Sequence, residues 1–68
     1  MRKAMEELAV DHLVLEKNRP ADKLSDAYRE HMHQIYLVYE EMVRRVGIDH
    51  TLTYLDQARA TYELLDPP

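Results

Sequence analysis

The sequence predicts an all-helical protein. Its 68 residues include one glycine and no tryptophan, phenylalanine or cysteine, and residues that favour helices are abundant. Internal turn signals occur at two places, Asn18–Pro20 and Gly47–Asp49. They divide the chain into three periodic segments joined by short connections. We therefore expect one domain over residues 1–68, in which a short, a long and a short helix form an up-down three-helix bundle.

The first helix is expected over residues 3–17. Its first turn is acidic and Lys17 lies in its last turn, as the helix dipole favours. One face carries a regular apolar stripe, but Val10, Leu13 and Val14 lie on the other side, so the helix is apolar nearly all round. Such a helix requires burial on several sides.

The second helix is expected over residues 20–46. Pro20 suits a first helical turn, where its missing N–H makes no difference, and Gly47 is the typical residue just beyond a helix end. A second apolar row widens its buried face to roughly 160°, more than one neighbouring helix covers. This helix should be the spine of the protein. Its main stripe consists of Ala21, Leu24, Tyr28, His31, Ile35, Val38 and Met42.

The third helix is expected over residues 50–65, with Asp49 or Thr51 as its cap and the Pro67-Pro68 pair as its stop. Arg59 lies at the edge of its apolar stripe. It could form a local pair with Asp56 or a bridge to another helix.

Self-association is expected because a chain of this length buries only about 60% of its unfolded surface and has no disulfide to compensate. The alternative is that the third helix covers the outer side of the first within a single chain. Tyrosines suit shared surfaces, although they also suit the edges of a small core. The predicted interface consists of Val10, Leu13, Val14, Tyr36, Leu37 and Tyr39.

The charge balance is acidic, with 13 Asp and Glu against 9 Lys and Arg. This balance opposes binding to phosphate backbones, so nucleic acid is not an expected partner. The chain contains no apolar run long enough to span a membrane and does not open with a signal-peptide pattern. We expect a small acidic cytoplasmic protein that does not bind membranes.

One pattern suggests metal chemistry. Glu30 and His33 have the Glu-x-x-His spacing of helical di-iron proteins, and Asp26 lies on the same face. All three fall on the polar side of the second helix, where such residues are usually solvated. His12 and His31 lie on apolar stripes and are interpreted as hydrogen-bonded structural histidines. No catalytic residue and no cofactor is predicted.

The predicted function is a non-catalytic helical module for oligomerisation and protein–protein interaction. It would form a homo-oligomer, a dimer or higher, and could act as a small adaptor or regulator of a larger protein, including a DNA-binding one. The alternative is a metal-binding helical protein that uses Glu30 and His33.

Overall fold

The computed structural model describes the backbone of residues 2–65 and the side chains of residues 2–62. It contains two helices, α1 (Met5–Lys17) and α2 (Asp26–Leu65), and no strand within the described residues. The predicted all-helical class is confirmed. The predicted stop at Pro67 and Pro68 lies outside the described residues.

Helix α1 has local signals at both ends. The extended backbone of Ala4 precedes it, and the Ala4 carbonyl accepts the Leu8 N–H at 3.1 Å. At the other end, the backbone N–H and the side-chain amide of Asn18 donate to the Val14 carbonyl, at 3.1 and 2.9 Å. Asn18 therefore satisfies a carbonyl that the helix end would leave unpaired.

Helix α2 begins at Asp26 rather than near Pro20. The Asp22 carboxylate accepts the Leu24 N–H at 3.0 Å, which forms a turn, and the Ser25 hydroxyl then accepts the Tyr28 N–H at 3.1 Å as an N-cap. These side-chain bonds stabilise a non-helical connection over residues 18–25. As a result Leu24, which the sequence pattern placed on the buried stripe, is 91% exposed.

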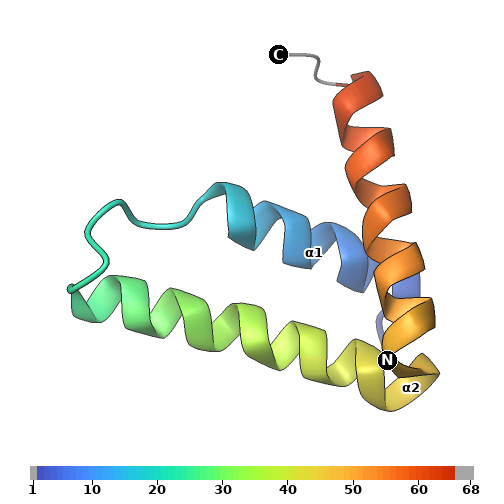
Figure 1. Ribbon diagram of the computed structural model, residues 1–68, viewed down its shortest axis with the longest axis horizontal. Coiled ribbons are helices and arrows are strands. Elements are labelled where there is room, and N and C mark those ends of the chain that lie inside the picture. Colours follow the sequence, from blue (N-terminus) through green and yellow to red (C-terminus); the bar gives the residue numbers. More distant parts are fainter. Residues whose placement is uncertain (1, 66–68) are drawn as a thin grey trace.

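Gly47 divides α2 into two arms, a first arm over residues 26–46 and a second arm over residues 48–65. Its φ of 84° and ψ of 169° are outside the helical region, and the chain bends sharply there (Figure 1). A positive φ at this glycine agrees with its predicted place at a helix end. The predicted cap Thr51 instead donates its hydroxyl to the Gly47 carbonyl at 2.7 Å, while its side chain is fully buried.

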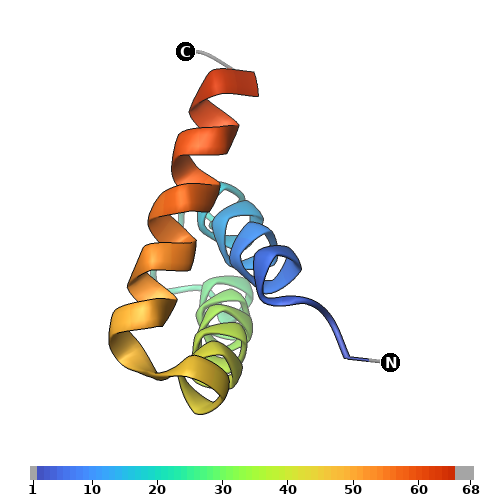
Figure 2. The same ribbon diagram turned by 90° about the vertical axis from the view of Figure 1, so that its right-hand side faces the viewer.

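The two arms contact α1 in different ways. The first arm lies beside α1 and runs antiparallel to it, whereas the second arm crosses over the amino-terminal half of α1 (Figures 1 and 2). The Cα radius of gyration is 12.7 Å, against about 11 Å for a compact domain of this length. The arrangement is thus more open than a set of three aligned helices.

The core lies where α1 and both arms of α2 meet. Met42 of the first arm is fully buried and packs with Leu8, Ala9, Leu55 and Ala58. The small side chains of Ala9 and Ala58 let the second arm approach α1 closely. Five half-buried residues complete this cluster: Met5, Val10, Val38, Tyr39 and Tyr54.

None of the described helices combines the length and the apolar composition that crossing a bilayer requires.

Candidate functional site

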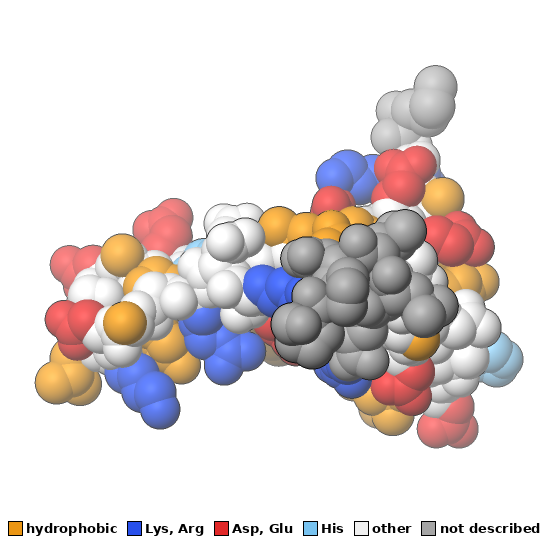
Figure 3. All heavy atoms as spheres, turned by 90° about the horizontal axis from the view of Figure 1, so that it is seen from above, with side chains coloured by type: hydrophobic (Ala, Val, Ile, Leu, Met, Phe, Trp, Pro, Cys, Tyr) orange, Lys and Arg blue, Asp and Glu red, His pale blue; other side chains and the backbone are white. Residues whose placement is uncertain are grey.

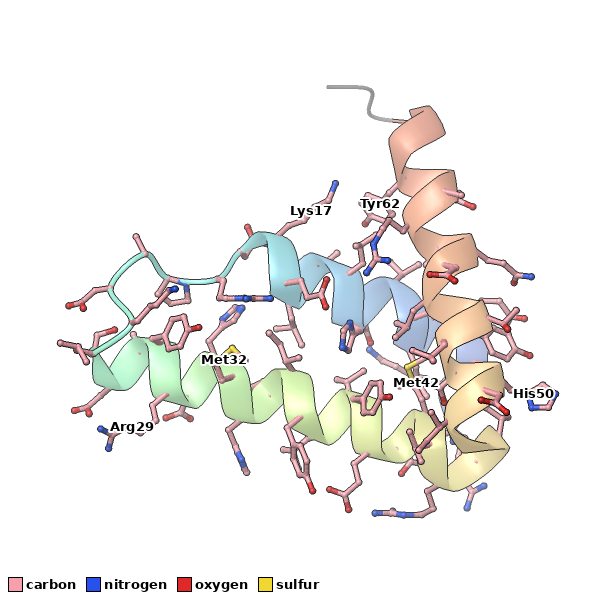
Figure 4. All side chains as sticks on the ribbon, in the orientation of Figure 1. Lys17, Arg29, Met32, Met42, His50 and Tyr62 are labelled. Atoms are coloured by element: carbon pink, nitrogen blue, oxygen red, sulfur yellow. The ribbon has the colours of Figure 1, made fainter. Side chains whose placement is uncertain are left out.

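A cavity of about 330 Å³ lies between the carboxyl-terminal half of α1 and the second arm of α2. We call it the cationic corner. In Figure 4, Lys17 and Tyr62 extend toward each other across its mouth, from α1 and the second arm respectively, and the Lys17 ammonium is 5.0 Å from the Tyr62 ring centroid. The cavity is lined by Leu13, Glu16, Lys17, Arg19, Arg59 and Tyr62.

Positive charge exceeds negative charge in the cationic corner. Among the described side chains, three cations line it against one carboxylate, in a chain whose net charge is −4. Arg59 approaches Glu16 at 3.8 Å and Asp56 at 3.6 Å, and its side chain is half exposed. Both separations exceed the roughly 2.8 Å of a tight charge-assisted hydrogen bond. The guanidinium of Arg59 therefore retains the capacity to bind a further anion.

Glu16 links the corner to a buried histidine. His12 is 6% exposed, and its Nδ1 lies 3.4 Å from Glu16. Burial lowers the pKa of His12, and the positive charges of Arg59 and Arg19 lower it further, while Glu16 acts in the opposite direction. The His12 ring also lies 6.0 Å from the Tyr39 ring. His12 is thus a neutral core residue under the corner.

The second arm carries two exposed apolar residues near the corner. Ile48 and Leu52 are 57% and 48% exposed and lie about one helical turn apart. At 100° per residue, Ile48, Leu52 and Arg59 fall within about 40° of one another around the helix. Since Arg59 faces Glu16 of α1, this apolar stripe, Ile48 and Leu52, lies on the corner side of the second arm.

The residues of the predicted interface are divided by the structure into two groups. Leu13 is 5% exposed, and Val10 and Tyr39 pack against the core cluster. The side chain of Leu13 is therefore inside the single chain, and Arg59 and Tyr62 of the second arm border the same cavity as Leu13. The other three stay exposed: Val14 at 37%, Tyr36 at 59% and Leu37 at 45%.

Val10 also borders a second, more apolar groove of about 230 Å³ between α1 and the second arm. The side chains of Tyr54 and Ala58, both on the second arm, are part of the wall of this groove. Small residues at the crossing leave this shallow space beside the core.

The residues proposed for a metal site lie together on the exposed side of the first arm. Asp26, Glu30 and His33 border a shallow depression with Arg29, whose positive charge would repel a metal cation. Within the described residues, no three His, Asp or Glu side chains are arranged to hold a metal ion. The arrangement gives the metal-binding alternative no support.

The core histidines have the kind of partner expected of structural residues. His31 contacts the Leu15 carbonyl through Nε2 and thereby connects the first arm to α1. His12 has the Glu16 carboxylate beside it. Both contacts join groups that burial would otherwise leave unpaired.

The sequence patterns did not predict that the cations of the corner lie at one cavity. Lys17 was explained by the helix dipole, and Arg59 by either a local pair or a bridge. The structure shows both the local approach to Asp56 and the longer bridge to Glu16. Residues 42 positions apart meet only because of how the second arm crosses α1, and no local signal in the sequence encodes that crossing.

The chain was compared with protein-family models, with curated proteins and with solved structures, and none of the three comparisons found a match. The functional argument therefore depends on the residues and contacts described above.

Proposed function

We propose that this protein is a non-catalytic helical module that self-associates and serves as a small adaptor or regulator for a larger protein partner. One observation carries the proposal. Among the described residues, large apolar side chains remain exposed almost as often as apolar side chains are buried. Six are exposed, Val14, Leu24, Tyr36, Leu37, Ile48 and Leu52, and seven are buried, Leu8, Ala9, Leu13, Ile35, Met42, Leu55 and Ala58.

This ratio of exposed to buried apolar side chains favours self-association. Two of the seven buried residues are alanines, which contribute little apolar area, so the core of a single chain is small. Burying an exposed Leu or Tyr contributes up to roughly 1.5–3 kcal/mol. The open arrangement of the arms leaves room for a second copy beside the first arm. Completing a bundle with helices from that copy is the form of association we propose.

The proposed self-association surface contains Tyr36 and Leu37, which are adjacent on the first arm, together with Val14 of α1. Tyrosine provides a large contact area at a small loss of side-chain entropy, and so it is common in such surfaces. The other predicted interface residues contribute to the interior of the single chain. Val10 and Tyr39 pack against the core cluster, and the side chain of Leu13 is buried.

The cellular compartment and the kind of partner are part of the same proposal. The acidic, cysteine-free composition supports a cytoplasmic setting. The acidic balance also supports a protein partner over nucleic acid.

Sedimentation velocity over a wide concentration range tests the self-association. The natural chain should sediment as a dimer or larger species at high concentration. Leu37→Asp should weaken that association by roughly tenfold or more. The reason is that the interface would then bury a carboxylate in place of an apolar side chain. Leu24→Asp is the matched control, since Leu24 is equally apolar and 91% exposed but lies in the connection.

Circular dichroism must show that both variants keep their helicity. A natural chain that remains a monomer at every concentration contradicts the proposal, as does a Leu37→Asp variant that associates as strongly as the Leu24→Asp control.

A further inference from the structure

We propose that the cationic corner and the apolar stripe together bind an acidic amphipathic helix of a partner protein. This surface shares no residue with the proposed self-association surface of Val14, Tyr36 and Leu37, so it goes beyond the function proposed above. Three observations support it: the surplus of cations in the corner, the exposed apolar residues on the same side of the second arm, and the concave shape of the corner.

The first observation is electrostatic. Lys17 and Arg19, two residues apart at and just beyond the end of α1, and Arg59 of the second arm surround one cavity, and among the described side chains Glu16 is the only carboxylate in its lining. Glu16 is shared between Arg59 and His12, at 3.8 and 3.4 Å. A carboxylate of a partner that entered the cavity would meet a net positive site with available hydrogen-bond donors.

The second observation is the position of the apolar stripe. Ile48 and Leu52 share a side of the second arm with Arg59, and the row from Ile48 to Arg59 is about 16 Å long at 1.5 Å per residue. That length corresponds to about three turns of a partner helix. Apolar side chains one turn apart on that helix would cover Ile48 and Leu52, and acidic residues two turns further along would reach the corner.

The third observation concerns shape and selects a helix over a membrane. Lys17, Arg19 and Arg59 line the concave space between α1 and the second arm, and Figure 4 shows Lys17 of α1 beside Tyr62 of the second arm there. A narrow helix enters such a corner, whereas a flat bilayer does not. In the view from above, acidic side chains lie at both ends of the molecule, among apolar and basic side chains (Figure 3). These acids would repel a broad anionic bilayer that covers them, whereas a helix confined to the corner leaves them in solvent.

A second copy of this chain is a poorer fit for the same surface. One exposed side of the chain that combines acidic residues with an apolar residue is the outer side of the first arm, around Leu37. There Arg44 already pairs with Glu40 and Glu41, each at 3.1 Å. These carboxylates would have to leave an existing partner before they could enter the corner.

The test uses a fluorescein-labelled synthetic peptide with two Leu one helical turn apart and a Glu pair two turns further along, otherwise Ala and Gln. Two companion peptides replace either the Glu pair by Lys or the Leu pair by Gln. Fluorescence anisotropy should show binding of the acidic amphipathic peptide alone, weakened by added salt. Vesicles containing phosphatidylserine serve as the membrane probe.

Matched substitutions locate the binding surface. Arg59→Gln should weaken peptide binding roughly threefold to fivefold, and Leu52→Gln roughly fivefold to tenfold. Two outer variants, Arg44→Gln on the first arm and Leu24→Gln in the connection, remove the same side-chain types outside the proposed surface and should leave binding unchanged. All four side chains are substantially exposed, so the fold should persist, which circular dichroism checks.

Several results would overturn the proposal. It fails if the Lys peptide binds as well as the Glu peptide, if the acidic amphipathic peptide does not bind, or if the corner variants and the outer variants weaken binding equally. Binding to the vesicles without binding to the peptide would show a lipid surface instead. Binding of the peptide only by the self-associated form would assign the effect to the first arm.

Discussion

The bend at Gly47 provides the sharpest test of how this fold is held. Gly47 has φ 84° and ψ 169°, a region that is essentially restricted to glycine. An added Cβ at this position would meet no atom within 4 Å. Replacing Gly47 by L-alanine therefore perturbs the backbone conformation alone, without a steric clash.

The expected loss follows from that geometry. A side chain in this region costs about 1–3 kcal/mol, and reduced freedom of the unfolded chain returns about 0.4–1 kcal/mol. The net loss is about 1–2 kcal/mol, from a total stability of about 3–10 kcal/mol for 68 residues. With an unfolding entropy near 0.14 kcal/mol/K, Tm should fall by about 7–14 °C.

Thermal unfolding followed by circular dichroism measures this change. The control is D-alanine at the same position, introduced by chemical synthesis, because the mirror-image residue favours positive φ. Its Tm should stay at or rise above that of the natural chain. Equal melting temperatures for the L- and D-alanine chains would refute the reasoning, since they would show that the backbone at this position does not depend on handedness.

Three further predictions concern the interior. Met42→Ala should destabilise the fold by about 3 kcal/mol, because a fully buried side chain at the meeting point of the helices leaves a cavity; urea unfolding measures it. Thr51→Val should cost about 1–2 kcal/mol, because the Gly47 carbonyl loses a partly buried hydrogen bond at nearly constant volume; the same assay applies. Stability should fall on mild acidification, because burial lowers the pKa of His12 in the folded chain, and the midpoint of urea unfolding at several pH values reports it.

The sign of the pH effect follows from the order of protonation. As pH falls through 6.5, the ordinary pKa, His12 of the unfolded chain binds a proton before His12 of the folded chain does. Stability therefore declines from pH 6.5 down to the lowered folded pKa and then levels off. Glu41, whose pKa is lowered by a hydrogen bond from Arg45, changes the pH dependence of stability only below pH 4.5, where its stabilising contribution is lost.

Matched control variants separate these specific effects from a general loss of stability. His12→Asn should flatten the pH profile, whereas His33→Asn, at an exposed position, should keep it; equal slopes would contradict the role of His12. Leu52→Ala is the control for Met42, and a Met42→Ala loss no larger than that of Leu52→Ala would show that Met42 is not at the centre of the core. Thr53→Val is the control for Thr51, because Thr53 donates to the Asp49 carbonyl at an exposed position, and an equal loss would contradict the role of burial.

The local chemistry of the sequence predicted much of the secondary structure. Helix-favouring composition gave the all-helical class, and the single glycine marked the bend at Gly47. The start of α2 was missed although its signals are local. Asp22 and Ser25 form a turn and a cap by bonds over two or three residues, and these bonds prevail over the preference of Pro20 for a first helical turn.

The sequence by itself therefore determined which segments are helical and where α2 must bend, because those properties depend on backbone preferences and on side chains within a few residues. Only the tertiary structure decided that the second arm crosses α1 and covers Leu13 instead of leaving it for a partner. That direction depends on close packing of Ala9, Ala58 and Met42, which come from three separate segments. The same crossing brings Lys17 and Arg59 to one cavity, a consequence of packing that helical periodicity does not contain.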